Sequence, residues 1–282
     1  MINGFLLVHK DSGITSSRVV QIIKKKFNLK KVGHLGTLDP MATGLLIIAV
    51  NRATKFASLL LQSEKSYRAE VTLGTQTDTD DAEGEVISSK NIHQNKSEVK
   101  EILLTFLGDS DQLPPNYSAL KHKGKPMYKY ARDGIKVKKS ARKIFIKNIN
   151  NIEINLPKVS FDIKCSKGTY IRSVARDLGL KLGCGAHLSK LIRTSQEKFN
   201  LSDACSLADT SLEKLISLEN AFEDLDFIQL NESDAAAFLH GRSIQTDFEH
   251  TELLRVYAPK INLLQLVKKL ARASSMNTLF NQ

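Results

Sequence analysis

Hydrophobic positions along the chain fall into short runs that differ in their spacing. Gly4 to Val8 and Leu45 to Val50 are too short and too uniformly apolar for surface helices, so each run predicts a buried strand. Tyr67 to Leu73 predicts another strand. Val159 to Cys165 alternates with period two, which predicts a half-buried strand beside a second one over Ile144 to Ile154.

Apolar spacings of three and four residues predict the helices. We expect Ser16 to cap a helix that runs to about Phe27. Other expected helices cover residues 54–61, 97–107 with Gly108 as C-terminal cap, 171–178 ending near Gly179, 207–218, and 234–239 closed by Gly241. Helices and strands are mixed without repeated βαβ units, so we expect an α+β fold and not a doubly wound parallel sheet.

The length of 282 residues is large for one hydrophobic core and predicts one large domain plus a smaller one. The hydrophobic pattern changes near Phe227, so the expected division is 1–226 and 227–282. The longest aliphatic stretch is far shorter than the roughly 20 residues of a membrane-spanning helix. The first residues lack a basic leader, so no signal peptide is expected.

The chain has three cysteines, Cys165, Cys184 and Cys205. Their odd number and wide spacing fit neither a zinc clip nor a dense disulfide framework. We expect reduced thiols with a structural role, as in a protein of the cytoplasm.

The net charge of +11 indicates a polyanionic partner, and most of it lies in one segment. Residues 121–147 contain eleven basic residues and one acid, giving +10, whereas the other 255 residues sum to +1. Tyrosines lie among these lysines at positions 117, 128 and 130, and aromatic rings beside cations are what unpaired bases stack on. A solvated face is the alternative. A membrane surface is less favoured, because no basic amphipathic helix is apparent.

The stretch Gly33 to Gly44 is the most unusual in the chain. Its three glycines permit backbone conformations that other residues avoid, and Pro40 stiffens the turn directly after Asp39. A carboxylate there would be presented at a rigid site before a buried strand. The alternative is an ordinary Asp-Pro turn. Neither phosphate-binding glycine motif is present.

Arg172 follows a predicted strand and opens a predicted helix. It could give a buried carboxylate its counter-charge, or it could lie on a solvated helix start. The acidic stretch from Asp78 to Glu83 has the wrong spacing for a hand-type calcium loop, so we expect a hydrogen-bonded turn. The seven histidines form no metal-binding motif, and we expect no metal and no cofactor.

Taken together, these stretches resemble the TruB family, the bacterial tRNA pseudouridine-55 synthases. The match begins at Ile2 and continues in order over about 195 residues. Its blocks are GHLGTLDPMATG (33–44), ATKF (53–56), SYRAEVTLGTQTDTDDAEG (66–84), PPNYSALKHKGKPMYKYARDG (114–134), CSKGTYIRSVARDLG (165–179) and AHLSKLIRTS (186–195). The resemblance implies a mixed, largely antiparallel sheet with flanking helices in residues 1–226.

The resemblance also implies a role for individual residues. Asp39 matches the catalytic aspartate, which attacks the target nucleotide so that uracil detaches, rotates and rejoins through carbon. His34 matches the histidine that fills the space left by the extruded uridine, and Tyr67 the tyrosine stacked on the flipped base. Arg172 matches the arginine that pairs with the catalytic carboxylate. Further pocket-lining or supporting positions are Tyr170, Leu191, Lys10, Lys55 and Asp81.

The basic segment falls on the family's RNA-gripping loop, at about 114–147 in this chain. The side chains expected to contact the RNA backbone are Lys121, Lys123, Lys125, Lys129, Arg132, Lys136, Lys138, Lys139, Arg142 and Lys143. Residues 227–282 loosely resemble the small PUA-like RNA-binding β-barrel. Their last 25 residues are helix-prone and lack its usual glycines, which leaves open whether the barrel is complete.

The resemblance therefore implies a monomeric, cofactor-free RNA isomerase of the cytoplasm that converts one uridine in the T-loop of tRNA by base flipping and covalent catalysis. It implies no membrane and no obligate protein partner. A second hypothesis is a tRNA-binding folding helper whose catalysis is secondary or lost, since phosphate contacts alone support binding. A third is a uridine-isomerising enzyme that acts on ribosomal RNA or within a guide-RNA particle.

Overall fold

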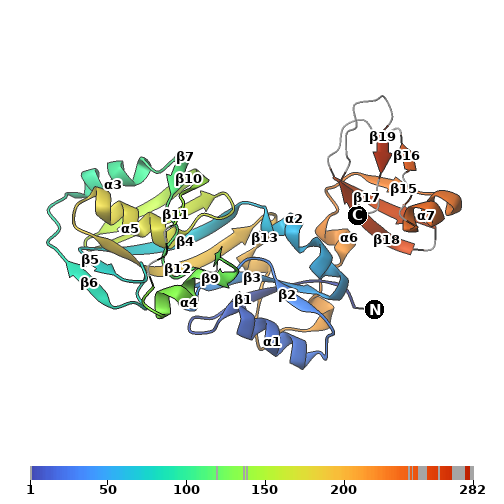
Figure 1. Ribbon diagram of the computed structural model, residues 1–282, viewed down its shortest axis with the longest axis horizontal. Coiled ribbons are helices and arrows are strands. Elements are labelled where there is room, and N and C mark those ends of the chain that lie inside the picture. The colour runs from blue at the N-terminus through green and yellow to red at the C-terminus, as the bar shows by residue number, and fades with distance from the viewer. Residues whose placement is uncertain are drawn as a thin grey trace.

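The computed structural model describes residues 2–118, 120–135, 137, 139–240, 242, 244–246, 253–259, 261–268 and 277–279. Its largest feature is a ten-stranded sheet (Figure 1). In order across the sheet, its main strands are β14 (Cys205–Ser206), β1 (Gly4–Lys10), β3 (Thr43–Val50), β12 (Ala186–Gln196), β4 (Lys65–Leu73), β11 (Lys158–Cys165), β10 (Arg142–Asn155) and β7 (Gly108–Gln112). Two short strands, β2 (Val32–His34) and β13 (Phe199–Asn200), pair with β3 and β12.

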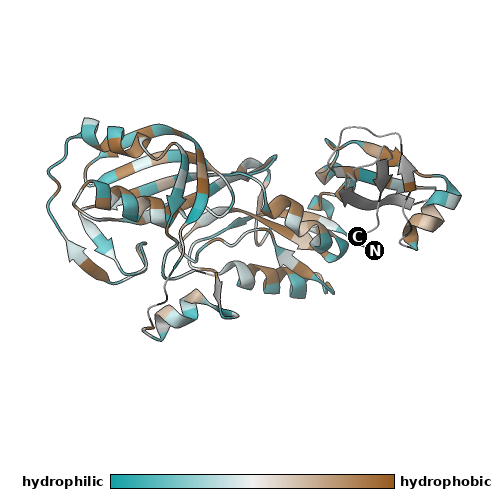
Figure 2. Cartoon of the chain, turned by 45° about the horizontal axis from the view of Figure 1, so that its top comes forward, coloured by the Kyte–Doolittle hydropathy of each residue, from teal (hydrophilic) through white to brown (hydrophobic). Residues whose placement is uncertain are grey.

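Most neighbouring strands of this sheet are antiparallel. Among the described pairs, only β1 with β14 and β3 with β12 are parallel. The predicted α+β class with a largely antiparallel sheet is therefore confirmed. Figure 2 shows hydrophobic and hydrophilic residues alternating along the strands, as expected where one face of a sheet is buried.

The helices cover the two faces of the sheet unequally. Three helices, α1 (Ser16–Lys26), α3 (Lys96–Leu104) and α5 (Ile171–Lys181), pack on one face and share one core. On the other face a second core includes residues of η1 (Asn51–Phe56), α2 (Ala57–Leu61) and α6 (Leu218–Ala221), which pack mainly against β1 and β3. On that second face β4, β11 and β10 carry half-buried and exposed polar side chains, and we call this surface the open face.

Shorter elements extend from the sheet. The strands β5 (Thr75–Thr77) and β6 (Val86–Ser89) form a hairpin, as do β8 (Lys121–His122) and β9 (Lys125–Pro126), which leads into α4 (Met127–Arg132). Two 3-10 turns, η2 (Leu201–Asp203) and η3 (Leu212–Lys214), follow β13. None of the described helices has the length and hydropathy needed to cross a membrane.

A smaller group of described elements, the first of which starts at Phe227, lies beside the α6 end of the molecule (Figure 1). It has its own core, which includes Phe238 and Leu254. Its elements are β15 (Phe227–Gln229), α7 (Glu232–Leu239), β16 (Ile244–Thr246), β17 (Leu253–Ala258), β18 (Ile261–Lys268) and β19 (Asn277–Leu279). The helix-prone interpretation of the last 25 residues is wrong for β18 and β19. Gly241, expected to close α7, lies outside the described residues.

Two predicted helix ends are also wrong. Thr15, not Ser16, caps α1: its side chain accepts a hydrogen bond from the Arg18 backbone N–H. The helix expected over 97–107 ends at Leu104, and Gly108 opens β7 instead of capping the helix. Gly108 has φ of +89°, so it makes the turn into the strand.

Three further differences come from tertiary packing. The helix expected over 207–218 is absent from that described segment, where only η3 and the first residue of α6 are helical. The central strand β12 was not predicted, because a bulge between Leu188 and Lys190 interrupts its alternation. Helix α5 continues past Gly179, where a Cβ would lie 2.2 Å from the Ala186 nitrogen. That glycine allows the helix to approach the start of β12.

Candidate active site

Asp39 lies in the loop between β2 and β3, and this loop is held through its backbone. The buried Ser16 hydroxyl donates to the Leu38 carbonyl at 3.0 Å and accepts from the Leu38 N–H at 2.9 Å. The fully buried Lys10 ammonium donates to the Pro40 carbonyl at 3.1 Å. The residues on either side of Asp39 are therefore both fixed, as expected for a rigid carboxylate site.

Arg193, on β12, holds the beginning of the same loop. Its guanidinium donates to the carbonyls of Gly36 at 3.1 Å and Thr37 at 2.9 Å. The whole residue is only 1% exposed. Gly44 has φ of +100°, and a Cβ there would lie 2.4 Å from the Arg193 carbonyl oxygen. Both conditions require glycine at the end of the loop.

Arg172 lies at the start of α5 and meets the Asp39 carboxylate with two nitrogens. Its Nη2 donates to Asp39 Oδ1 at 3.1 Å, and its Nε lies 2.9 Å from Oδ2. The Nε–H is not aligned for a hydrogen bond, so that second contact is electrostatic. The Arg172 side chain is 5% exposed and that of Asp39 31%, so the carboxylate keeps an opening to solvent. The alternative of a solvated helix-start arginine is wrong.

The other contacts of Arg172 fix its orientation. It donates to the backbone carbonyls of Thr79 at 3.0 Å and Tyr117 at 2.8 Å. Its Nη1 also lies 3.4 Å from Asp81 Oδ2, and the Asp81 side chain is 5% exposed. Asp81 in turn accepts hydrogen bonds from the Thr79 hydroxyl and the Glu83 N–H. The acidic stretch is thus a hydrogen-bonded turn, and its Asp81 supports the arginine.

Asp39 and Arg172 open onto a cavity of about 260 Å³. Three predicted pocket residues, Tyr67, Tyr170 and Leu191, line it together with them. Tyr67 and Leu191 are each 7% exposed. A cavity with apolar walls and a few convergent charged groups can hold a planar, weakly polar ring next to a nucleophile.

Two basic residues that line this cavity, Lys65 and Arg193, were not among the site residues predicted from the sequence. Lys65 is 9% exposed and lines the cavity, with its ammonium donating to the carbonyls of Leu61 and Ser63. The Arg193 guanidinium carbon lies 5.7 Å from the centre of the Tyr67 ring. Lys65 falls in phase with the buried residues of β4, and a charge at an apolar position is a signal that sequence reasoning could have used.

Burial shifts the titration of these groups. It raises the pKa of the Asp39 carboxyl; Arg172 opposes the rise, and the Asp81 carboxylate adds to it. Burial lowers the pKa of Lys10 and of Lys65 to about 8 each, from an ordinary value of 10.5. Burial also raises the pKa of the Tyr67 hydroxyl. These are the shifts expected of charges held away from water.

His34 and Lys55 do not line the cavity. His34 ends β2, and its Nδ1 is buried without a hydrogen-bond partner in the described structure. Burial and the nearby Arg193 lower the pKa of its ring, so the imidazole is neutral at pH 7. Lys55 is exposed on η1.

The basic loop is more internally bonded than its charge suggests. Lys125 pairs with Asp133 at 2.7 Å and lies 4.9 Å from the Tyr130 ring centre. Lys139 donates to the Pro114 carbonyl at 2.7 Å, and Arg142 lies 5.7 Å from the Tyr170 ring centre. Lys143 pairs with Asp111, whereas Lys123 and Lys129 are exposed. Lys136 and Lys138, and the side chains of Lys121 and Arg132, lie outside the described residues.

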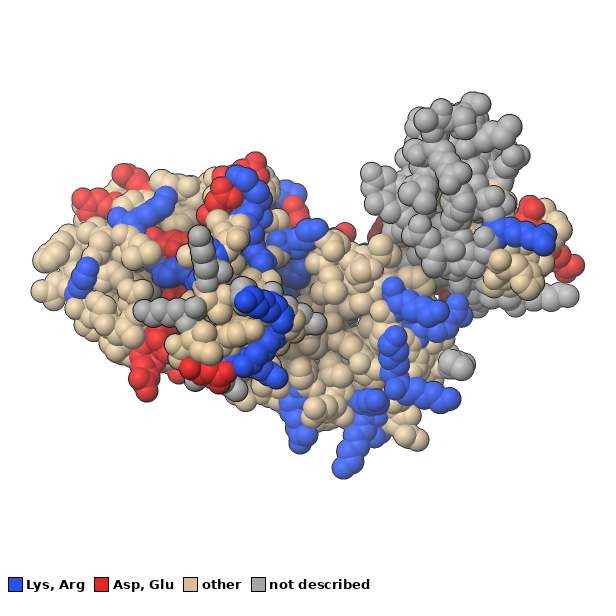
Figure 3. All heavy atoms as spheres, viewed as in Figure 1, with Lys and Arg blue, Asp and Glu red and all other residues tan. Residues whose placement is uncertain are grey.

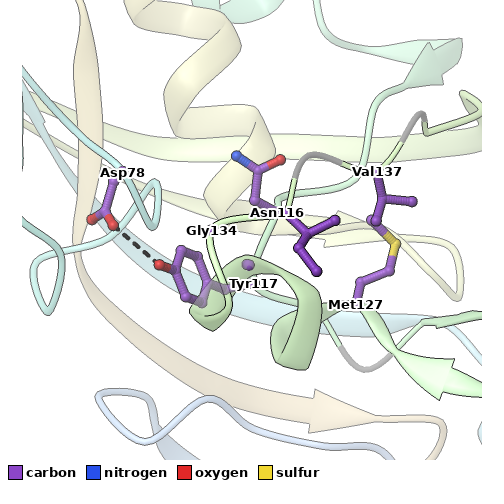
Figure 4. Close-up of a pocket in the computed structure, with 8 residues that line it drawn as sticks. Asp78, Asn116, Tyr117, Met127, Gly134 and Val137 are labelled. Atoms are coloured by element: carbon purple, nitrogen blue, oxygen red, sulfur yellow. Dashed lines mark hydrogen bonds between the residues drawn. The ribbon is translucent and has the colours of Figure 1, made fainter.

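A second cavity, of about 350 Å³, lies under α4 (Figure 4). Met127, Ala131, Ile135 and Val137 form its apolar side. At its polar end the Tyr117 hydroxyl points toward Asp78 and donates to its carboxylate at 3.3 Å (Figure 4). This bond ties the root of the basic loop to the acidic turn.

Basic side chains also gather near α1, in residues 12–63, which hold eight Lys or Arg residues and one acid, Asp39. In Figure 3 several blue side chains project from this end of the molecule, at the lower right of the view. The net charge outside residues 121–147 is only +1, because acidic residues elsewhere in the chain offset the positive charge of residues 12–63. Among the described residues, no three His, Cys, Asp or Glu side chains are grouped to hold a metal ion.

Comparison with known proteins identifies the class. The model of the N-terminal domain of TruB family pseudouridylate synthases matches residues 24–171. The model of the tRNA pseudouridylate synthase B C-terminal domain matches residues 172–230. The chain is therefore a pseudouridylate synthase, and it belongs to the TruB family.

Relatives and solved structures agree with this family. A tRNA pseudouridine synthase B of Alkaliphilus oremlandii is 45% identical over 79% of this chain and 73% of its own. That of Francisella tularensis is 44% identical over 91% of this chain and 88% of its own. Among solved structures, a Cbf5-Nop10-Gar1 complex gives a TM-score of 0.73 at 26% identity, over 98% of this chain and 83% of that chain. The structure of an H/ACA RNP bound to a substrate RNA containing 2'-deoxyuridine gives a TM-score of 0.71 at 25% sequence identity, over 99% of this chain and 83% of that chain.

Proposed function

We propose that this enzyme makes pseudouridine in tRNA at one uridine of the T-loop, position 55, with Asp39 as the nucleophile. The observation that carries the proposal is the Asp39 carboxylate, which is fixed by its loop and by Arg172 and faces a cavity lined by Tyr67. The relatives named tRNA pseudouridine synthase B support tRNA as the substrate.

The chemistry follows from the carboxylate and the size of the cavity. A target base inside an RNA stack cannot reach Asp39, so the uridine must be flipped out. Asp39 forms a bond to a carbon of the flipped nucleotide, and the glycosidic C–N bond breaks. The uracil turns within the cavity and rejoins the sugar through carbon. The ring carbon loses its proton, a ring nitrogen gains one, and the carboxylate is released.

The surrounding side chains have distinct roles in this proposal. Tyr67 stacks on the flipped uracil, while Tyr170 and Leu191 complete the walls of its pocket. Arg172 keeps the Asp39 carboxylate oriented, and Lys10 keeps the loop behind it in place. His34 fills the gap in the RNA with a neutral ring. The basic loop binds the RNA backbone, because phosphates are attracted to lysine and arginine regardless of sequence.

We further propose that the enzyme acts in the cytoplasm as a monomer, without a metal or cofactor and without an obligate protein partner. The three cysteines are free thiols, as is usual for proteins of a reducing compartment. Addition of a chelator should leave the rate unchanged.

The test is pseudouridine formation on a T-arm stem-loop RNA, with EDTA present, by wild type and by Asp39→Asn. We expect conversion of a single loop uridine by wild type and none by the variant, with RNA binding within a few-fold. Arg172 retains Asp81 and two backbone carbonyls in the variant, so the fold is kept. Turnover near the wild-type rate would disprove the role of Asp39. Binding without conversion by wild type would favour the folding-helper hypothesis.

A further inference from the structure

Arg176 forms a second arginine–aspartate pair one helical turn after Arg172, with a half-buried arginine and a buried aspartate. Its Nη1 lies 3.1 Å from Asp80 Oδ2, and the two side chains are 12% and 9% exposed. Its Nη2 donates to the Leu113 carbonyl at 2.9 Å. Arg176 therefore joins the acidic turn, which carries Asp80, to the start of the basic loop, which follows Leu113.

The same side of α5 holds the start of the loop at several points. Ser173 donates to the Leu113 carbonyl at 2.9 Å. Tyr170 and Gln112 exchange two hydrogen bonds, of 2.8 and 3.1 Å. Arg172 donates to the Tyr117 carbonyl at 2.8 Å. Residues three and four positions apart share one face of a helix, so Arg172 and Ser173 lie on the same side of α5 as Arg176. The contacts of this side therefore extend from Arg176 to the pair of Arg172 with Asp39.

Asp80 is held in an unfavourable backbone conformation. Its φ is +62°, a region that residues with a side chain seldom occupy. The surrounding contacts hold it there: its carbonyl accepts from the Leu188 N–H at 3.0 Å, and its carboxylate pairs with Arg176. A strained residue that is fixed by several partners next to a reactive group is a pattern found at functional sites.

We propose that Arg176 and Asp80 are positioning residues that hold the root of the basic loop and the acidic turn in register, so that Arg172 stays on Asp39. The proposal rests on the proposed role of Asp39. Arg172 bonds both to the acidic turn, through Thr79 and Asp81, and to the loop root, through Tyr117. If the two segments separate, Arg172 cannot satisfy both, and its alignment with the carboxylate is lost.

This role has a kinetic signature. Arg176 and Asp80 contact each other and the backbone segments that hold Arg172, and neither contacts the exposed Lys123 or Lys129 of the basic loop. Its loss should therefore lower the rate of the chemical step and change RNA affinity little. Loss of an interaction that is made mainly in the transition state lowers kcat, whereas loss of uniform binding raises KM.

The experiment measures single-turnover rates at saturating T-arm RNA, KM and the unfolding midpoint for matched variants. Arg176→Gln leaves Asp80 buried without its partner, so the double variant Asp80→Asn/Arg176→Gln is made as well, with neither charge of this pair left. Asp177, which Arg176 also contacts at 2.8 Å, is 30% exposed and can be solvated in both variants. Arg68→Gln is the control. Arg68 also bonds a carboxylate and a backbone carbonyl, Glu153 at 2.6 Å and Asn151 at 2.8 Å, but on the open face.

We expect the double variant to lose about tenfold or more in rate with KM within about threefold, at a temperature where it is folded. Arg68→Gln should keep the wild-type rate. A wild-type rate in the double variant would show that the pair only balances charge, and this inference would be overturned. If Asp39→Asn were inactive in the same experiment, the proposed function would still stand. An active Asp39→Asn would overturn the proposed function itself.

Discussion

The two faces of the sheet carry similar ion pairs in different surroundings. On the open face Arg68 bonds Glu153 at 2.6 Å and Asp162 at 3.3 Å, and its side chain is 28% exposed. On the covered face Arg172 contacts Asp39 and Asp81, and its side chain is 5% exposed. The two faces pair the same types of side chain, but the arginine of the covered face is far more buried than that of the open face.

The carboxylates of the two faces also differ in the direction of their pKa shifts. On the open face burial acts to raise the pKa of Glu70, but hydrogen bonds from Lys158 and Ser189 outweigh it, and the pKa lies below its ordinary value. On the covered face burial raises the pKa of Asp39 in spite of Arg172. A less acidic carboxylate is a better nucleophile when ionised, which suits a covalent step.

The largest expected effect of this difference is at Arg172. Arg172→Gln leaves Asp39 and the buried Asp81 without their counter-charge, which for a buried pair costs about 3–5 kcal/mol in stability. Turnover should fall about 100-fold or more, because Asp39, the proposed nucleophile, also loses its orientation. Chemical denaturation and single-turnover rates measure both. If Arg172→Gln were as stable as wild type and had the wild-type rate, the ion pairs of the covered face would matter no more than those of the open face.

The second prediction concerns pH. In the proposed reaction the Asp39 carboxyl must be ionised to attack, and burial raises its pKa in the folded protein. The rate should therefore fall on acidification at a pH above 3.8, the ordinary value for this carboxyl. A pH profile of the single-turnover rate tests this. A rate that stays constant down to 3.8, in protein that remains folded, would contradict the shift.

A smaller effect is expected in the basic loop, at the exposed Lys123 and Lys129. Replacing both by Gln should weaken RNA binding and reduce the slope of log affinity against log salt by about two, one for each lost phosphate contact. The single-turnover rate at saturating RNA should not change. An unaltered salt slope would show that these lysines do not contact RNA.

The smallest effect is expected at Arg68. Exposed ion pairs contribute about 0–1 kcal/mol, so Arg68→Gln should shift the free energy of unfolding by no more than that. Added salt should reduce even this difference, because exposed charges are screened. A loss of several kcal/mol would show that the open face contributes to stability as the covered face does.

Local sequence was enough to single out Asp39 and to predict its loop. The glycines and Pro40 between Gly33 and Gly44 define a loop by backbone conformation alone, and Gly36 and Gly44 adopt positive φ there. The acidic turn was also readable, because its bonds join residues only two to seven positions apart. The basic loop was visible as a run of charge, although the bonds within it were not.

Tertiary structure decided the rest, since those contacts join distant segments. Asp39 and Arg172 are 133 residues apart, and only the packing of α5 against the sheet brings them together. The burial of Lys65 and Arg193 depends on β12, whose bulge conceals its strand pattern. The sequence by itself determined where the Asp39 loop, the acidic turn and the basic loop lie, through local backbone preferences and charge. The sheet decided which of their charges are buried and paired, because burial is a property of the whole packed core.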